Sequence, residues 1–214
     1  MRVAVAIPTI TPQGAERATA LANEISLMDD FLVVVIDNGG HVKNTHGWLR
    51  WGPHLSVAAS WNTALRTNLD VSTVVLLNDD VVVTPGGLRE LALASELSRQ
   101  RFLNGRGPLE LVAAEPHAFA CFAMHPDLVA AVGYFDEEFV PAYYEDTDYL
   151  IRMGRAGVKL RTIDIGLRHD APGTSSRELG RDWTETAKNS RAYFLRKWGS
   201  KRYPYIHPFN KAPT

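Results

Sequence analysis

The sequence lacks most of the features that would assign it to a specialised class of protein. Its 214 residues include a single cysteine, Cys121, so no internal disulfide can form, which suits a reducing compartment. The formal net charge of −1 provides no general attraction to nucleic acid or membranes. No apolar run approaches the roughly 20 residues needed to span a bilayer, and Met1-Arg2 lead directly into a strand-like segment. We expect a soluble, cytoplasmic protein.

A glycine-rich phosphate loop is also missing after the first apolar segment. The residues that follow it, Pro8 to Pro12, contain no G-x-G-x-x-G motif, which argues against a dinucleotide-binding fold of the NAD type. Internal repeats and low-complexity segments are absent as well. An apolar fraction of 45% is ordinary for a globular protein, and the chain length fits one large domain or one domain with an appendage.

Short apolar runs alternate with segments of helical periodicity along the chain. Buried strands are predicted at residues 3–7, 31–36, 74–77, 109–114, 118–124 and 158–165. Helices are predicted at residues 14–28, 57–69, 87–101, 126–132 and 182–198, with a further helix capped by Asp146 or Thr147 and running to Ala156. Ser175 and Ser176 are predicted to lie in a polar loop. The strand–helix–strand order of the first half predicts an α/β fold with parallel strands and right-handed crossovers.

The central feature is a pair of carboxylates directly after the third predicted strand. Asp79 and Asp80 stand at the end of a buried strand, where open α/β sheets bind ligands. Adjacent like charges raise each other's pKa, and a hard cation such as Mg²⁺ or Mn²⁺ would relieve this repulsion. The alternative is a turn in which an aspartate caps the next helix. Asp37, at the end of the second strand, can likewise bind a ribose or base, or form an ordinary Asp-Asn turn.

Five separated segments resemble, in order, the inverting family 2 glycosyltransferases of the GT-A fold. They are Val5-Ala6-Ile7-Pro8-Thr9; Val34 to Gly39; Ser60-Trp61-Asn62; Leu76 to Val81 with Pro85-Gly86; and a long run from Val132 to His169 that includes Tyr144 to Tyr149, Arg152 and Ala156-Gly157. The chain looks most like the rhamnosyl- and galactofuranosyl-transferase branch. The resemblance covers about residues 3–170 and implies a mostly parallel central sheet flanked by helices.

The resemblance implies a nucleotide-sugar donor bound by the first half of the chain, together with a divalent metal, Mn²⁺ or Mg²⁺. Donor contacts are expected from Pro8, Thr9 and Asp37 in the nucleoside pocket, from Asn62 near the nucleoside or diphosphate, and from Asn78 and Asp79. Asn78-Asp79-Asp80 match the D-x-D motif of the family with asparagine at its first position, so Asp80 is the expected metal ligand. His169 matches the histidine that completes the metal site in some members.

Catalysis is expected from the acids at the start of the predicted helix near residue 146. Asp146 matches the second acid of the family's Glu-Asp motif and is the expected base for the acceptor hydroxyl. Glu145 is expected to hold the acceptor or share that role, and Asp148 to pair with Arg152, four residues on. With one base and no evident nucleophile, the displacement should invert the anomeric centre. Nearby aromatic residues either stack on an acceptor sugar or pack on the core: Tyr134, Phe135, Tyr143 and Tyr144.

The domain organisation follows from the extent of the resemblance. We expect one nucleotide-diphospho-sugar transferase domain at residues 1–170, with a donor-binding half at 1–108 and an acceptor and catalytic half at 109–170. Residues 171–214 are expected to form a helical extension packed on it. This extension is basic with interleaved aromatic residues, and three interpretations stay open: contacts to the donor diphosphate, a patch for an anionic acceptor such as nucleic acid, or an amphipathic helix with a solvated basic face.

These observations predict a metal-dependent inverting glycosyltransferase, of the hexosyl or a similar type. Its donor would be a UDP, GDP or dTDP sugar, and its acceptor a hydroxyl of a glycan, a protein or a modified nucleic acid. One alternative is a sugar-phosphate nucleotidyltransferase, although Pro8 to Pro12 stand where such enzymes carry a glycine-rich loop. The other is a non-catalytic module that binds nucleotide sugars or glycans on the same fold, for which a base at Asp146 would be unnecessary.

Overall fold

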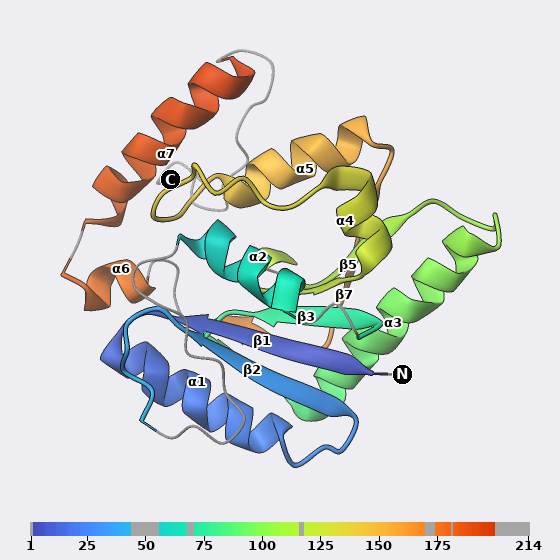
Figure 1. Cartoon of the computed structure of the whole chain (residues 1–214), viewed down its shortest axis with the longest axis horizontal. Helices are drawn as coiled ribbons and strands as arrows, with labels where there is room; N and C mark the ends of the chain where they lie inside the picture. The colour runs from blue at the N-terminus through green and yellow to red at the C-terminus, as the bar shows by residue number, and fades with distance from the viewer. Residues whose placement is uncertain are drawn as a thin grey trace, which may run out of the picture.

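A computed structural model describes residues 2–43, 56–67, 71–115, 118–169, 174–180 and 182–199 (Figure 1). The strands are β1 (Val3–Thr9), β2 (Phe31–Asp37), β3 (Thr73–Leu77), β4 (Val81–Val82), β5 (Glu110–Ala114), β6 (Cys121–Met124), β7 (Lys159–Ile163) and β8 (Arg168–His169). The helices are α1 (Pro12–Ile25), α2 (Val57–Thr67), α3 (Pro85–Leu103), α4 (Pro126–Val132), α5 (Glu145–Arg155), α6 (Thr174–Glu178) and α7 (Trp183–Trp198), with one 3₁₀ turn, η1 (Ala118–Ala120).

Six strands form the central sheet in the order β2-β1-β3-β6-β5-β7, and β4 pairs separately with β8. Strand β6 runs antiparallel to β3 and β5, whereas the other three pairings in the sheet are parallel. The predicted mostly parallel sheet flanked by helices is therefore confirmed.

The core lies in two layers, one on each face of the sheet. Successive side chains of a strand point to opposite faces, so Val5 and Ile7 of β1 pack with α1 and α3, whereas Ala4 and Ala6 pack with α2, α4 and α5. Burial on both faces explains why β1 and β3 are continuous apolar runs without polar alternation. The two helical layers are separated by the sheet in Figure 1.

Local capping contacts set the starts of several helices. The Ser56 hydroxyl accepts a hydrogen bond from Ala59 N at 3.1 Å, and Thr84 does the same for Gly87 N at 3.1 Å. Asp182 accepts one from Thr184 N at 2.8 Å. Each side chain satisfies a backbone N–H that has no partner inside the helix.

Four predicted elements differ from the structure. The strand predicted at 118–124 is divided into η1 and β6, and the strand predicted at 158–165 is shorter, as β7. Helix α5 begins at Glu145 rather than after Asp146 or Thr147, because Tyr144 occupies the cap position in a left-handed conformation. The segment around Ser175, which was predicted to be a polar loop, contains the short helix α6. A contact with a residue far away in the sequence, described below, holds this helix in place.

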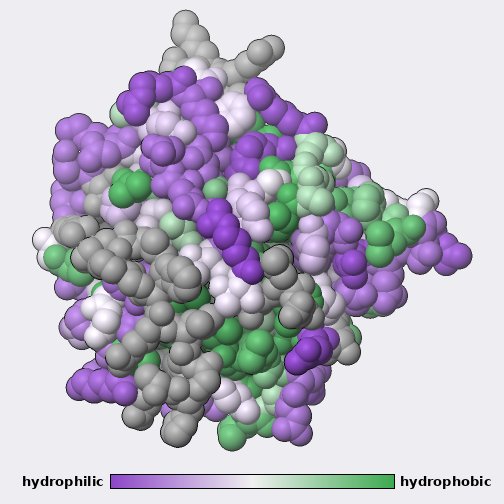
Figure 2. All heavy atoms as spheres, in the orientation of Figure 1, coloured by the Kyte–Doolittle hydropathy of each residue, from purple (hydrophilic) through white to green (hydrophobic). Residues whose placement is uncertain are grey.

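The described surface is mixed in character. Figure 2 shows hydrophilic residues over much of α5 and α7, and apolar residues near the carboxyl end of α3, where Phe102 and Leu103 are partly exposed. No helix within the described ranges is both long and apolar enough to cross a bilayer. Asp170 and the part of the basic extension beyond Gly199 lie outside the described residues.

Candidate active site

The carboxyl ends of β1, β2 and β3 form one edge of the sheet, at the left of Figure 1. Thr9 and Asp37 are register partners at the ends of β1 and β2, and Asn78, Asp79 and Asp80 follow directly after β3. We call this edge the active-site rim. It is where a twisted α/β sheet offers a ligand crevice.

Asp80 and His169 meet at the rim although 89 residues separate them. The short strands β4 and β8 pair antiparallel with Val81 opposite His169, and this register places His169 Nε2 3.0 Å from Asp80 Oδ1. Burial alone would raise the pKa of Asp80, but the contact with His169, together with hydrogen bonds from Thr174 and the backbone, holds the pKa below its ordinary value. The predicted pair of metal ligands is thus brought together by the fold.

A carboxylate oxygen beside an imidazole nitrogen suits Mn²⁺ or a similar divalent cation. Both side chains keep some exposure, 11% for Asp80 and 13% for His169, so a ligand can reach them. Within the described residues no third His, Cys, Asp or Glu joins them to make a protein-only metal cluster. Two protein ligands nevertheless suffice where substrate phosphates and water complete the coordination shell. The residues present therefore fit a metal that is held jointly by protein and substrate.

Asp79 points away from this pair, toward the start of α1. Its Oδ1 lies 3.6 Å from Arg17 Nη2, and its backbone oxygen accepts a hydrogen bond from Arg17 Nε at 3.2 Å. Burial, with the neighbouring Asp80 charge adding to it and Arg17 opposing it, raises the pKa of Asp79 to about 6. The two adjacent carboxylates therefore have different neighbours, and Asp79 faces a cationic side chain instead of His169.

Gly14 makes this arrangement possible. A Cβ at Gly14 would lie 2.2 Å from Asp79 Oδ2 and 2.5 Å from Thr9 Oγ1, far inside van der Waals contact. The side chains of Asp79 and Thr9 therefore occupy the space above the first turn of α1. That packing brings together two of the residues predicted to bind the donor.

Asp37 organises the loop that follows β2. Its carboxylate oxygens accept hydrogen bonds from the backbone N–H groups of four residues at 2.9–3.2 Å: Gly39, Gly40, His41 and Val42. The turn interpretation of Asp37 is thus confirmed, and a contact to the nucleoside stays a prediction. Pro8 is half-buried in β1, and Asn78, which donates its backbone N–H to Ala120 O at 2.9 Å, is half-buried after β3.

Asn62, which is predicted to lie near the donor, bonds to other parts of the protein in this structure, and a donor contact stays a prediction. Asn62 is fully buried, and its Nδ2 donates to Phe135 O at 2.9 Å and to Glu137 Oε1 at 2.7 Å. Its Oδ1 accepts from Phe135 N at 2.9 Å. The amide therefore connects α2 to the loop that precedes Glu145 and Asp146.

Glu145 and Asp146 begin α5 at the same edge of the sheet. Val57 N, at the start of α2, donates to Pro141 O at 3.0 Å, so the segment that leads into α5 lies beside the start of α2 (Figure 1). Burial raises the pKa of both acids, and for Glu145 the adjacent Asp146 charge adds to the effect. Glu145 Oε2 is buried without a hydrogen-bond partner within the described part of the chain.

Asp146 has the geometry of a usable base. Its Oδ1 accepts hydrogen bonds from Thr147 N at 2.6 Å and Thr147 Oγ1 at 3.2 Å, which fixes the carboxyl group. The side chain is only half-buried, so a substrate can reach it. A raised pKa makes the carboxylate a stronger proton acceptor than an exposed aspartate.

Two consecutive tyrosines before α5 have strained backbones. Tyr143 and Tyr144 have φ angles of 76° and 73°, in the left-handed region that residues with a Cβ avoid. Such conformations cost on the order of 1–3 kcal/mol each and are held by surrounding contacts, often at functional sites. Tyr144 is buried against Phe194 of α7, with ring centroids 5.2 Å apart.

Of the other two aromatic residues proposed for sugar stacking, Phe135 belongs to the core and Tyr134 is partly buried against it. Phe135 is 3% exposed, and its ring stacks on Tyr149 at 4.1 Å, while Tyr134 lies under the Arg66 guanidinium at 4.7 Å. The packing interpretation is confirmed for Phe135. The predicted pairing of Asp148 with Arg152 is confirmed as well, at 2.8 Å.

Sequence reasoning missed one network at the rim. Arg17 Nη1 contacts Glu178 Oε1 of α6 at 2.6 Å, and Glu178 also accepts a hydrogen bond from Thr11 Oγ1. This network ties α6 to the start of α1 next to Asp79. No local pattern could have revealed it, since 161 residues separate Arg17 from Glu178.

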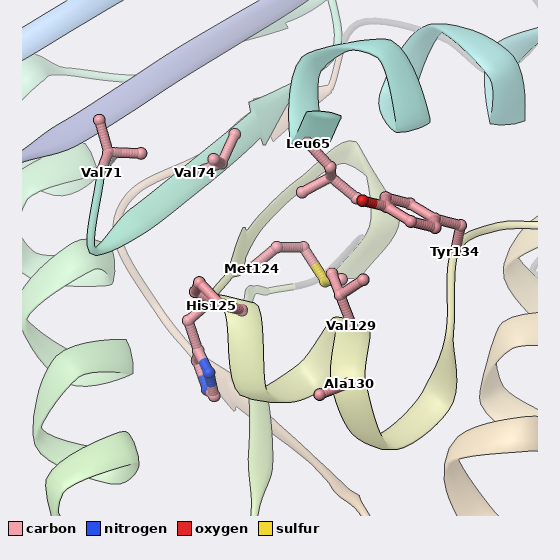
Figure 3. Close-up of a pocket in the computed structure, with 9 residues that line it drawn as sticks. Leu65, Val71, Val74, Met124, His125, Val129, Ala130 and Tyr134 are labelled. Atoms are coloured by element: carbon pink, nitrogen blue, oxygen red, sulfur yellow. The ribbon is translucent and has the colours of Figure 1, made fainter. Parts of the chain in front are cut away.

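A cavity of about 240 Å³ lies at the opposite end of β3 from the acids. Its lining is almost wholly apolar, with Leu65, Met124, Val129 and Tyr134 around it, and the His125 ring points away from its centre (Figure 3). It contains none of the predicted site residues, so the candidate site is the rim and not this cavity.

Comparison with solved structures finds several with a similar architecture. Glucosyl-3-phosphoglycerate synthase from Mycobacterium tuberculosis, in complex with Mn²⁺, UDP-glucose and phosphoglyceric acid, superposes with a TM-score of 0.57 at 16% identity, over 96% of this chain and 81% of that chain. The mannosyltransferase PcManGT from Pyrobaculum calidifontis, in complex with GDP-Man and Mn²⁺, gives 0.56 at 15% identity, over 95% of this chain and 66% of that one. TarS of S. aureus gives 0.53 at 13% identity, over 91% and 40%.

The chain has the GT-A fold. At these identities the likeness concerns the fold, and the activity has to be argued from the residues of the rim. No profile of a known protein family and no curated protein sequence matches the chain.

Proposed function

We propose that this protein is a metal-dependent glycosyltransferase that moves a sugar from a nucleoside-diphosphate sugar to an acceptor hydroxyl, with inversion of the anomeric centre. The observation that carries the proposal is the convergence of Asp80 and His169, 3.0 Å apart at the rim of a GT-A sheet. A binding module would not require a base such as Asp146. The solved structures of this fold that hold Mn²⁺ with UDP-glucose or GDP-Man add support.

Asp80 and His169 are the residues that would hold the metal. When bound there, a divalent cation supplies Lewis-acid stabilisation of the negative charge that develops on the departing diphosphate. On the protein side, Thr9 and Asp79 line the start of α1, and Arg17 adds a guanidinium close to the rim. We assign these side chains, with Pro8, Asp37 and Asn78, to donor binding.

Asp146 takes the proton from the attacking hydroxyl. Its raised pKa favours proton acceptance, and the hydrogen bonds from Thr147 keep its carboxyl oriented. Glu145 lies deeper and has a pKa raised well above the ordinary value, so it is suited to be protonated and to donate a hydrogen bond to the acceptor. With one base and no evident nucleophile among the residues that the structure describes, a single displacement inverts the sugar.

The proposed donor and acceptor classes are those that the family resemblance of the sequence implies. We propose a hexosyl or similar donor of the UDP, GDP or dTDP type and place the chain near the rhamnosyl- and galactofuranosyl-transferase branch. The acceptor is a hydroxyl of a glycan, a protein or a modified nucleic acid. We propose that residues 1–170 form the transferase domain and that the residues after 170 form an extension.

The test is release of free nucleoside diphosphate from a panel of UDP, GDP and dTDP sugars with Mn²⁺ and candidate acceptors. Asp146→Asn keeps the size of the side chain but removes the base, so transfer should fall by at least about 100-fold, the usual range for a positioned base. Donor binding, measured by calorimetry, should stay within about twofold.

Asp30→Asn is the matched control, because Asp30 is an exposed aspartate at the opposite end of β2 that pairs with Arg89. It should transfer sugar at the wild-type rate. Transfer by Asp146→Asn at a rate near that of Asp30→Asn would show that Asp146 is not the base. Binding of donors without transfer to any acceptor would favour the non-catalytic module.

A further inference from the structure

The C-terminal helix α7 contacts the chain on both sides of the acid pair Glu145-Asp146. One face of α7 carries the side chains that make these contacts: Ser190, Phe194, Lys197 and Trp198. Ser190 Oγ donates to Ala142 O at 2.7 Å, just before the strained tyrosines. The ring of Phe194 packs on Tyr144, the residue that precedes Glu145. Helix α7 thus packs against the segment that leads into Glu145 and Asp146.

Beyond the acid pair, α7 neutralises a buried charge. Asp148 is fully buried in the first turn of α5, and a buried carboxylate requires hydrogen bonds and an opposite charge. Arg152 supplies one hydrogen bond to Oδ2. Oδ1 receives Trp198 Nε1 at 2.9 Å and Lys197 Nζ at 2.6 Å, both from α7.

The indole and the ammonium group are themselves held in place. The Arg155 guanidinium lies over the Trp198 ring at 4.4 Å. Lys197 Nζ also contacts Asp136 Oδ2 at 2.6 Å, and the Tyr193 hydroxyl donates to the same Asp136 oxygen at 2.9 Å. One basic residue of the extension, Lys197, is therefore paired with two acids.

We propose that Trp198 and Lys197 are positioning residues: by holding Asp148 they fix the first turn of α5, and with it the carboxyl groups of Glu145 and Asp146. The inference rests on the proposed function for its effect on transfer, and on contacts alone for its effect on α5. Strained tyrosines before the acids make such a support necessary, because without it the segment could relax to an unstrained conformation.

The test compares Trp198→Phe with Tyr193→Phe in the full chain. Trp198→Phe keeps an aromatic ring under Arg155 and removes the N–H that reaches Asp148. Tyr193→Phe removes one donor from the same helix, but its acceptor is Asp136, which keeps Lys197. A comparison of the two variants therefore distinguishes the effect of weaker α7 packing from the effect of losing the hydrogen bond that supports α5.

Two measurements are made on each variant. Hydrogen–deuterium exchange at the backbone amides of residues 144–149 should be at least about tenfold faster in Trp198→Phe than in Tyr193→Phe or wild type. In the transfer assay, kcat should fall by about 10–100-fold, the range expected for a small misplacement of a catalytic group, with the KM for the donor within about twofold. Lys197→Met should behave like Trp198→Phe, and Lys197→Arg should restore both readouts.

The outcomes separate this inference from the proposed function. Equal exchange at residues 144–149 in the two aromatic variants overturns the inference, as does faster exchange with an unchanged kcat. Absence of transfer by the wild-type protein with every donor overturns the proposed function, whereas selective exchange in Trp198→Phe still supports the coupling of α7 to α5.

Discussion

Gly14 gives a sharp test of the rim, because helix propensity and local packing predict opposite results there. Gly14 lies in the first turn of α1, and propensity alone predicts that Gly14→Ala stabilises the protein by about 1 kcal/mol. The new Cβ would lie 2.2 Å from Asp79 Oδ2, 2.5 Å from Thr9 Oγ1 and 2.9 Å from Thr11 Oγ1. At least one of these side chains must move.

The packing effect is the larger one. Overpacking of a dense site costs about 1–3 kcal/mol. Displacing Thr11, whose hydroxyl accepts the hydrogen bond from Gly14 N at 2.8 Å, costs about 1 kcal/mol as the loss of a helix cap. After the gain in propensity is subtracted, Gly14→Ala should lower the free energy of unfolding by about 1–3 kcal/mol. For a chain of this size each kcal/mol lowers Tm by roughly 2–4 °C.

The assay is urea unfolding followed by circular dichroism, with donor affinity measured on the same samples. Gly154→Ala in α5 is the control, since a Cβ there meets no atom within 4 Å and should stabilise the protein by up to about 1 kcal/mol. Gly14→Ala should also weaken donor binding, because Thr9 and Asp79 must shift. A Gly14→Ala protein as stable as Gly154→Ala would refute the close packing of these side chains over α1.

Two further predictions concern the pH dependence and the metal. Since burial raises the pKa of Asp146 and the base must be deprotonated, kcat/KM should be full above that pKa and fall as the pH drops through it. A pH–rate profile with its acid limb near about 4, the value of an ordinary aspartate, would contradict this. His169→Ala should reduce the rise in Tm that Mn²⁺ produces, whereas Arg168→Ala, at its exposed neighbour, should not. Identical Mn²⁺ titrations of these two variants would exclude His169 as a ligand.

Elements governed by local signals could be predicted closely. Helix α4 has the predicted bounds, because a proline starts it and Gly133, with a φ angle of 87°, ends it. Strands β1 and β3 were recognisable because burial on both faces requires an uninterrupted apolar run. The start of α5 could not be predicted from the sequence, because Tyr144 has an unfavourable backbone conformation. Contacts with α7 stabilise that conformation.

The candidate site was predictable in its residues but not in its contacts. Asp79 and Asp80 could be identified from their place after a buried strand, and His169 from the family resemblance. Asn62 was assigned to the donor, and in the structure its amide bonds to Phe135 and Glu137, so its role toward a donor stays a prediction. A sequence cannot distinguish a buried asparagine that bonds a neighbouring loop from one that bonds a ligand, since both need the same polar atoms.

The sequence by itself determined the order of strands and helices and the edge of the sheet at which the acids lie, because apolar periodicity and capping are local properties. Only the tertiary structure decided the partners of each polar group: His169 for Asp80, Arg17 for Asp79, and Trp198 for Asp148. The reason is physical. A buried charge is stabilised by whichever donors the packed chain brings within about 3 Å, and these donors come from segments 50 to 89 residues away in the pairs Asp148–Trp198, Asp79–Arg17 and Asp80–His169.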